Sequence, residues 1–573
     1  MQCFRLPSRV SEKLDQINRD FFWKNSSTRK GLPLIAWDKI CCPKTVGGLG
    51  LRKTAAVNLA FLAKLAWKFL TQPDNFWAQL LTAKYYNPEG FFHYKIKPSD
   101  SWVWKCLLRI RPFLQQGLRW KLGNGKSIHF WTDVWCSQES LASQVGANLS
   151  ALTDVDIKVC EFITADKQWD SVRLNQVLPP NLVPVVQGIP IPSADVPDSF
   201  CWGLTGNGTF STKSATWKAH EHLSLSSHVW PYKWLWKLNV MPKIRVFLWQ
   251  LCHNSLPSRA TLLRRGIQLD PSCLACLTDI EDTDHIFLHC PLAKQTWDLA
   301  ISHKWLPSPP FGSLNLLARD QLHDLALQKS PILTRVALLF WSIWKSRNDL
   351  IFNNVSPHPM GTLLRAKRSW AEWKLRNSHF LNPLLSQSQS YCPKYCHPSI
   401  TPSIRWQLPA GGAVKLNCDG AKSSRGASAG FVLRNWTGSF IMAGTRYLAH
   451  APILVAEVTA IRDGLKAALE AGYRHIEVEG DNQVVISAIQ GRISPPWQIA
   501  SLIEDIKNLS QDCSDIYFKH IYREGNMAAD WVAKYGCTLQ SFSITFFHTP
   551  PSREFLFILA DDNLGRSLER GTA

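Results

Sequence analysis

The most constraining feature of this sequence is the order of strand and helix patterns over residues 413–541. Three stretches of alternating apolar and polar residues come first, and a fourth and a fifth follow, separated by apolar stripes at helical spacing. Alternation with a period of two is typical of half-buried strands, and spacing of three to four residues is typical of amphipathic helices. The order of three strands, helix, strand, helix, strand and helix predicts an α/β domain.

Four acidic residues lie at the ends of strand patterns or within helix patterns of this region. Asp419 ends the first strand pattern, and Asp481 directly follows the fourth. Glu457 lies one turn from the start of the first helix, and Asp530 lies inside the last, where Asn526 is placed as its cap. Converging carboxylates resist joint ionisation and require cations. Two Mg²⁺ ions about 3.5–4 Å apart can activate a water for attack on a phosphodiester. Each acid taken alone is more simply a surface residue.

These segments also resemble a known family. The sequences KLNCDGA at 415–421, AE at 456–457, EGDN at 479–482 and REGNMAAD at 523–530 resemble the four acidic motifs of type 1 ribonuclease H, in the same order. The resemblance implies a mixed five-stranded sheet with flanking helices and hydrolysis of the RNA strand of RNA–DNA hybrids. It also implies ligands for two Mg²⁺ or Mn²⁺ ions, namely Asp419, Glu457, Asp481 and Asp530.

The match departs from the family in two places. Many members carry a histidine in the loop before the last acid, whereas residues 522–526 contain none. His520 lies in the preceding strand pattern and is either a catalytic group or an ordinary strand residue. The basic, aromatic extension that helps some members hold hybrids is also absent, because the segment 491–497 is short. Two readings therefore stay open: an active hybrid ribonuclease, or a catalytically inactive remnant that binds nucleic acid.

A second set of chemically distinctive residues lies in the middle of the chain. Cys273, Cys276, His285 and Cys290 have the spacing C-x2-C-x8-H-x4-C. Three thiolates and one imidazole suit a closed tetrahedral Zn²⁺ site, whose role is structural because protein fills every ligand position. His289 is an alternative ligand, and four ordinary buried residues are the competing interpretation.

The positive charge lies mainly outside the α/β pattern. The formal net charge is +20, but residues 413–541 contain 13 Lys or Arg and 13 Asp or Glu, so the excess precedes them. Residues 233–265 hold seven Lys or Arg and no acid, interleaved with Trp234, Trp236 and Trp249. Such a surface could bind phosphates while its rings stack on unpaired bases of single-stranded nucleic acid. The alternative is that these rings belong to a hydrophobic core.

The block from residue 234 to 291 resembles the zinc-binding region downstream of reverse transcriptase in plant LINE-type retrotransposons, as do shorter stretches at 47–51 and 341–348. A polymerase requires paired aspartates on an aromatic-rich turn. The chain has one Asp-Asp pair, Asp561-Asp562, which follows the α/β pattern and reads as a solvated tail. The chain therefore resembles the C-terminal part of a retroelement polyprotein without the polymerase active site.

The sequence predicts a multidomain protein with an α-rich front half. Pro179-Pro180 and weak periodicity predict a loose connector after a short hairpin at Gly123-Asn124-Gly125. The Ser-, Pro- and Gln-rich composition of residues 375–412 predicts an interdomain linker. The expected parts are a helical region resembling the end of a reverse transcriptase (1–100), a Trp-rich connector (101–200), a zinc-binding region (201–300), a helical segment (301–374), a linker (375–412), the α/β domain (413–541) and a tail (542–573).

Targeting features are few. The N-terminus has charges in every apolar stretch, and the longest apolar run, 336–344, is far shorter than the roughly 20 residues that span a bilayer. The 16 cysteines are scattered rather than arranged as a disulfide framework. We therefore expect an intracellular protein, nuclear or cytoplasmic, that is neither secreted nor a membrane protein, with nucleic acid as its partner.

Overall fold

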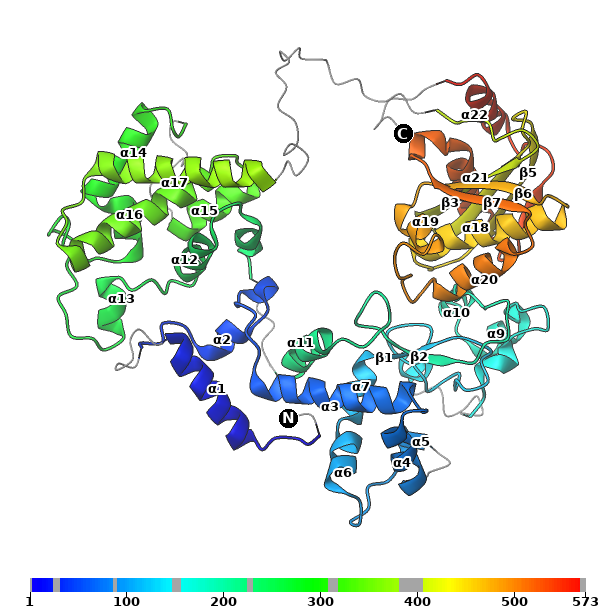
Figure 1. The fold of residues 1–573 in the computed structure, drawn as a ribbon, viewed down its shortest axis with the longest axis horizontal. Helices are drawn as coiled ribbons and strands as arrows, with labels where there is room; N and C mark the ends of the chain where they lie inside the picture. Colours follow the sequence, from blue (N-terminus) through cyan, green and yellow to red (C-terminus); the bar gives the residue numbers. More distant parts are fainter. Residues whose placement is uncertain are drawn as a thin grey trace. The chain divides into compact units, whose positions relative to one another are not determined.

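The computed structural model describes residues 3–23, 31–85, 90–146, 156–223, 230–307, 318–380 and 405–566. The chain divides into two units (Figure 1). Unit 1 comprises Met1–Phe4, Ala60–Ala215 and Tyr395–Ala573, and unit 2 comprises Arg5–Leu59 and Thr216–Lys394. Most of the expected linker, residues 381–404, lies outside the described residues.

Unit 2 is helical, as the sequence predicts, and its core is rich in tryptophan. Trp249 is buried, while Trp234 and Trp236 pack against the same core. Trp249 is therefore a core residue, whereas Trp234 and Trp236 are half-buried at the margin of that core. The elements are α1 (Ser8–Trp23), α2 (Trp37–Cys41), η1 (Lys44–Val46), η4 (Lys233–Lys237), α12 (Pro242–Cys252), α13 (Arg259–Arg264), η5 (His285–His289), α14 (Pro291–Ser302), α15 (Ala318–Leu327), α16 (Leu333–Asn353) and α17 (Pro359–Phe380).

The front part of unit 1 is more ordered than its sequence predicts. Phe130, Trp131, Phe162 and Leu174 belong to a hydrophobic core of this segment, so it is not a loose connector. Two helices, α3 (Thr54–Thr71) and α11 (Thr212–Leu223), contain residues of both units. The other elements are α4 (Phe76–Lys84), α5 (Gly90–His93), α6 (Trp102–Arg109), α7 (Arg111–Gly117), β1 (Leu118–Lys121), α8 (Leu141–Val145), η3 (Val159–Phe162), α9 (Ser171–Val177), α10 (Val183–Gln187) and β2 (Ser199–Trp202).

The prediction of a hairpin around Gly123-Asn124-Gly125 is wrong. Strand β1 pairs antiparallel with β2, which lies far along the chain. The reason is Asp198, whose carboxylate accepts hydrogen bonds from the backbone N–H groups of Gly123 (2.8 Å), Gly125 (2.9 Å) and Ser127 (2.8 Å). The glycine turn is therefore held by a distant acid instead of joining two neighbouring strands.

The rest of unit 1, residues 405–566, forms a domain around one sheet, which we call the sheet domain (Figure 1). Its strand order is β7-β6-β3-β4-β5-β8, with β3, β6 and β7 parallel and the other pairs antiparallel. The expected α/β fold is confirmed, with six strands where five were expected. The elements are β3 (Val414–Ser423), β4 (Gly426–Arg434), β5 (Phe440–Tyr447), α18 (Ile453–Glu470), β6 (His475–Gly480), α19 (Gln483–Ile489), α20 (Ala500–Ser510), β7 (Asp515–His520), η6 (Arg523–Gly525), α21 (Met527–Leu539), β8 (Thr545–Phe547) and α22 (Arg553–Asn563).

Helices cover both faces of this sheet. Phe431 of β4 packs with α18 in one core, and its neighbour Val432 packs with α21 in another, because successive side chains of a strand point to opposite faces. Helix α21 lies very close to the strands: a Cβ at Gly430 would be 2.3 Å from the backbone nitrogen of Ala533. This close packing places Asp530 of α21 over the edge of the sheet where β3 delivers Asp419.

The segment expected to be a solvated tail is part of the sheet domain. Strand β8 adds the sixth strand beside β5, and Phe555 of α22 is fully buried. Asp562 forms an ion pair of 2.7 Å with Arg434, whose side chain is 1% exposed. The Asp561-Asp562 pair is therefore structural, since one of its acids neutralises a buried cation.

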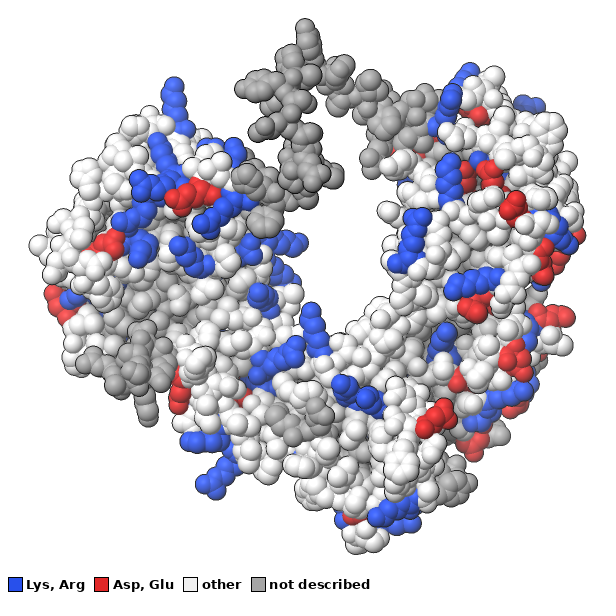
Figure 2. All heavy atoms as spheres, in the orientation of Figure 1, with Lys and Arg blue, Asp and Glu red and all other residues white. Residues whose placement is uncertain are grey.

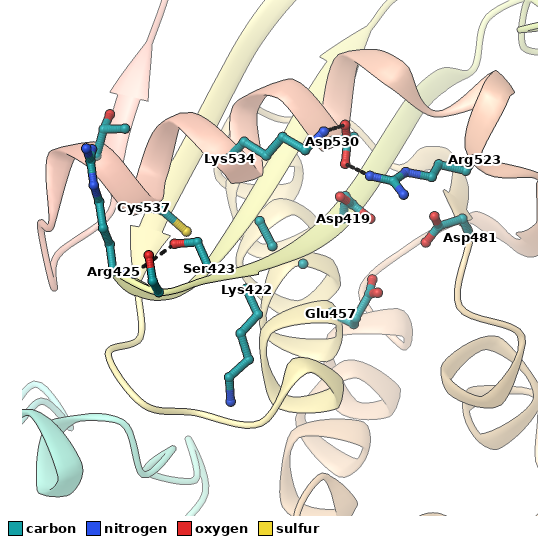
Figure 3. Close-up of a pocket in the computed structure, with 14 residues that line it drawn as sticks. Asp419, Lys422, Ser423, Arg425, Glu457, Asp481, Arg523, Asp530, Lys534 and Cys537 are labelled. Atoms are coloured by element: carbon teal, nitrogen blue, oxygen red, sulfur yellow. Dashed lines mark hydrogen bonds and ion pairs between the residues drawn. The ribbon is translucent and has the colours of Figure 1, made fainter. Parts of the chain in front are cut away.

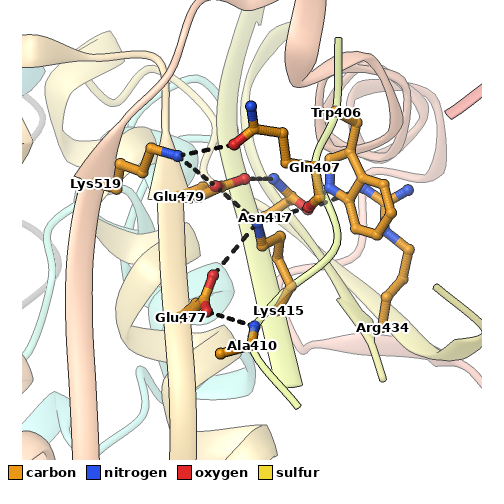
Figure 4. A network of polar contacts seen from close by, with 9 residues as sticks. All are labelled: Trp406, Gln407, Ala410, Lys415, Asn417, Arg434, Glu477, Glu479 and Lys519. Atoms are coloured by element: carbon orange, nitrogen blue, oxygen red, sulfur yellow. Dashed lines mark hydrogen bonds and ion pairs between the residues drawn. The ribbon is translucent and has the colours of Figure 1, made fainter. Parts of the chain in front are cut away.

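A buried polar network connects the residues that precede β3 to the sheet of the same domain (Figure 4). Lys415 is buried and pairs with Glu479 at 2.9 Å and Glu477 at 3.4 Å, and its ammonium also donates to the backbone oxygen of Gln407. The Trp406 ring lies 3.7 Å from the Arg434 guanidinium. These contacts show that the domain begins before residue 413, within the part expected to be linker.

Candidate functional site

Sheet topology brings Asp419 and Asp481 together. Strands β3 and β6 are parallel neighbours, and Cys418 is in register with Gly480. The residue after each of these two is an aspartate, so Asp419 and Asp481 lie beside each other. Asp481 directly follows β6 as expected, but the predicted strand end at Asp419 is wrong, because β3 continues to Ser423 in its pairing with β4.

Glu457 joins them from α18. A Cβ at Gly420 would lie 2.6 Å from the backbone nitrogen of Glu457, so only glycine lets the first turns of α18 approach β3 this closely. One carboxylate oxygen from each of Asp419, Glu457 and Asp481 lies within 4.8 Å of the others. We call these three residues the acid cluster.

The acid cluster is electrostatically costly. Asp419 is 5% exposed and Glu457 is 8% exposed. Burial first, and then the neighbouring carboxylates, raise the pKa of Asp419 to about 10. Burial and Asp481 raise the pKa of Glu457 to about 8, and burial also raises the pKa of Asp481. Buried carboxylates with raised pKa values are a suitable donor set for a hard divalent cation such as Mg²⁺, which would offset their repulsion.

Asp530 lines the same groove but is held differently. Its Oδ1 accepts a hydrogen bond from Arg523 at 3.1 Å, and its Oδ2 lies 2.6 Å from the ammonium of Lys534 (Figure 3). Asp530 does not belong to the acid cluster, and both of its oxygens are paired with cations. The sequence pattern indicated the convergence of four acids, but the structure brings three of them within ligand distance of one another.

The groove around the acids contains cationic side chains as well. Its volume is about 580 Å³. Its cationic lining residues are Lys422, Arg425, Arg523 and Lys534 (Figure 3). A groove that combines a cation-binding acid cluster with exposed ammonium and guanidinium groups is suited to a phosphate diester, whose oxygens could contact a bound metal ion and these cationic side chains.

Two residues near the groove have roles other than those expected. Asn526 makes no side-chain cap for α21; its amide donates instead to the backbone oxygen of Cys418 at 2.9 Å, which ties η6 to the strand that carries Asp419. His520 ends β7, and its Nε2 lies 3.0 Å from the backbone oxygen of Asp481. His520 therefore contacts the backbone beside the acid cluster.

The sequence reasoning missed Arg523 and Lys534. The signal for Lys534 was available, because residues four apart on a helix share a face and Lys534 follows Asp530 by four. For Arg523 the motif itself offers the signal, since it begins REGN and places a cation seven residues before the acid.

The predicted zinc ligands come together in unit 2. Single ligand atoms of Cys273, Cys276, His285 and Cys290 all lie within 4.8 Å of one another, and among the described residues His289 is not a member of this group. His285 lies at the start of η5, and Cys290 follows η5 directly. Three sulfurs and a nitrogen at this spacing are a donor set that fits Zn²⁺.

Hydrogen bonds orient the zinc ligands. The His285 Nε2 lies 3.4 Å from the Cys276 sulfur, and its Nδ1 faces Asp279 at 3.7 Å, as in the carboxylate–histidine arrangements that fix the ring of a metal ligand. The hydrogen bond with Cys273 raises the pKa of His285 to about 9. Hydrogen bonding to Cys290, followed by burial, raises the pKa of Cys273 to about 11.

Two family models match the regions that hold these two sites. Residues 417–536 match the family described as reverse transcriptase-like, and residues 210–297 match the family described as zinc-binding in reverse transcriptase. The chain joins a reverse transcriptase zinc-binding region to a ribonuclease H-like domain. The ribonuclease H-like domain is the sheet domain with its acid groove, and the zinc-binding region contains the Cys₃His group.

Similar proteins extend the comparison to the whole chain. A protein of Arabidopsis thaliana, provisionally named a ribonuclease H protein, is 27% identical over 100% of this chain and 91% of its own. An uncharacterized mitochondrial protein of the same plant is 29% identical over 24% of this chain and 92% of its own. The crystal structure of ribonuclease H1 from the archaeon Halobacterium salinarum is 26% identical, with a TM-score of 0.22, over 22% of this chain and 98% of that one.

Among the described residues, none of the helices is long and apolar enough to cross a membrane.

Proposed function

We propose that this protein is a metal-dependent endonuclease that hydrolyses the RNA strand of RNA–DNA hybrids. The observation that carries the proposal is the acid cluster, in which Asp419, Glu457 and Asp481 come within 4.8 Å of one another in a groove that also contains cations. This cluster lies within the residues that match the reverse transcriptase-like family. The ribonuclease H-like domain supplies the fold, and the groove supplies the chemistry.

The acidic and basic side chains of the groove have different roles in this proposal. In the proposed reaction the acid cluster, with Asp530 as a further ligand, would hold Mg²⁺ or Mn²⁺, which would supply an activated water and stabilisation of the leaving oxygen. Lys422 and Arg425 contact backbone phosphates at the far end of the groove. The 2′-OH groups and the shape of the hybrid distinguish the RNA strand.

The zinc-binding region has a structural and binding role in this proposal. Zinc held by the Cys₃His group fixes the ends of η5 within the core of unit 2. Lys and Arg side chains are dispersed over the face drawn in Figure 2, so phosphate binding is spread over many weak contacts. We further propose that the chain derives from a LINE-type retroelement and acts inside the cell.

The alternative is a nucleic-acid-binding remnant without turnover. Two observations favour it: both oxygens of Asp530 are paired with cations, and the loop at 522–526 contains no histidine. The acid cluster favours the enzyme, because two buried acids and a half-buried one without a cation to bind cost stability.

Strand-specific cleavage tests the proposal. The full chain with Mg²⁺ should cut the labelled RNA strand of an RNA–DNA hybrid and leave its DNA strand, a DNA duplex and an RNA duplex intact. Binding of the hybrid without cleavage would support the remnant instead.

A further inference from the structure

Asp530 is the one acid of the groove that is already neutralised within the described residues. Its two oxygens are paired with Arg523 and Lys534, whereas no residue of the acid cluster forms an ion pair in the described part of the chain. Each of these cations uses one lone pair of a carboxylate oxygen and repels a metal ion, so the two ion pairs weaken metal binding at Asp530. Asp530 becomes a stronger metal ligand when one of the two ion pairs opens.

The partners of Asp530 are reachable from solvent, although Asp530 is not. The Asp530 side chain is 8% exposed, whereas that of Lys534 is 59% exposed and that of Arg523 is 49% exposed. All three line the groove that contains the acid cluster (Figure 3). A phosphate entering this groove therefore meets the two cations before it meets the acid beneath them.

The ion pairs of Asp530 with Arg523 and Lys534 are weak enough for a bound phosphate to replace them. An ion pair with an exposed partner is weak, because water and salt screen it and its long side chain loses freedom. A backbone phosphate offers the same cations charged oxygens without requiring burial. Lys534 lies one helical turn from Asp530 on α21, so its flexible stem can turn toward the groove without movement of the helix.

We propose that Lys534 and Arg523 form a latch on Asp530, which withholds this carboxylate from a divalent cation until a nucleic-acid phosphate binds the two cations. The latch rests on the proposed function, because it assumes that nucleic acid enters the groove. Lys534 is then a positioning residue that couples substrate binding to completion of the metal site.

Titration calorimetry of Mg²⁺ into the full, zinc-loaded chain tests the latch without turnover. In the absence of nucleic acid, Lys534→Ala should tighten the weaker Mg²⁺ site about two- to fivefold, which is the range expected from loss of one exposed ion pair. Lys534→Arg should restore the wild-type value. Lys466→Ala is the matched control, because Lys466 pairs with Glu470 at the same i,i+4 spacing, at 3.8 Å, on α18.

A second titration brings in phosphates without an RNA strand to cut. A short DNA duplex should tighten the weaker Mg²⁺ site of the wild type, and should tighten it less in Lys534→Ala, whose latch is already half open. An isotherm of Lys534→Ala equal to that of Lys466→Ala, or an equal effect of the duplex on wild type and Lys534→Ala, would overturn the latch. These outcomes are independent of cleavage, so failure of the nuclease assay counts against the proposed function alone.

Discussion

The carboxylate of Asp562 lies 2.7 Å from the guanidinium of Arg434, and the Arg434 side chain is 1% exposed. This ion pair joins α22 to the central strand β4, so the ribonuclease H-like domain continues well past the last acidic motif. Trp406 covers the other side of the same guanidinium at 3.7 Å. The functional domain therefore includes segments from both ends of residues 405–566.

Removing Asp562 should destabilise this domain strongly. Asp562→Ala leaves Arg434 as a buried charge without its partner, for which we expect a loss of about 3–5 kcal/mol. Asp561→Ala is the matched control, since Asp561 is half-exposed and pairs with exposed Arg566, and it should cost less than about 1 kcal/mol. Thermal denaturation of the full chain measures both, and equal transitions for the two variants would contradict the structural role of Asp562.

The acid cluster predicts a pH dependence of stability in the presence of a chelator. The pKa of Asp419 is about 10 in the folded chain, above the ordinary value of 3.8, so between these values the folded state holds protons that the unfolded state releases. Stability should therefore fall as pH rises from about 5 to 9. Asp419→Asn should flatten this slope, whereas Asp512→Asn, which changes an exposed acid outside the groove, should keep it. A wild-type melting temperature that rises over this pH range would contradict the prediction.

Mg²⁺ should reverse that trend. Binding requires ionised carboxylates, so Mg²⁺ should raise the melting temperature more at pH 9 than at pH 6 and should release protons on binding. Glu457, whose pKa is about 8, should account for part of this change near neutral pH. Calorimetry in two buffers of different ionisation enthalpy measures the released protons, and a buffer-independent heat would argue against cation binding at the cluster.

The zinc group predicts the metal content of the protein. The purified chain should contain about one zinc ion, held by four protein ligands. Cys273→Ser should lose the zinc and destabilise unit 2, because the Cys273 side chain belongs to its hydrophobic core. His289→Ala, which changes the alternative ligand, should keep it. Elemental analysis of the three proteins decides the matter, and zinc retention in Cys273→Ser would exclude this ligand set.

Binding of hybrids should depend steeply on salt. Dispersed Lys and Arg side chains that neutralise several phosphates release counterions, so log affinity should fall linearly with log salt concentration, with a slope of about −0.9 per phosphate for duplex DNA. Measurements on the full chain with Asp419→Asn would avoid cleavage. A flat salt response would show that phosphate contacts contribute little.

The sequence predicted those parts of the site that follow from local patterns. Alternation located β3 and β6, and the parallel register of these strands places Asp419 beside Asp481, although β3 continues four residues beyond Asp419. The cysteine spacing located the zinc group for a similar reason, because the ligands lie close together in the chain.

Long-range contacts could not be predicted. Strand β8 has three residues, too few for a periodic signal, and its place depends on β5. The pairing of β1 with β2 depends on Asp198, which is remote from the glycine turn that it holds. In the same way, the sequence around Asp562 did not indicate that its side chain is buried, because its ion-pair partner Arg434 lies on another element.

The most direct test of the proposed nuclease activity is Mg²⁺-dependent cleavage of the RNA strand by the full chain, compared with Asp419→Asn and Asp512→Asn. The wild type and Asp512→Asn should cut the RNA strand, chelation should abolish the cut, and Asp419→Asn should be folded but lack cleavage. Cleavage that survives in Asp419→Asn, or no cleavage by the folded wild-type chain, would contradict the proposal.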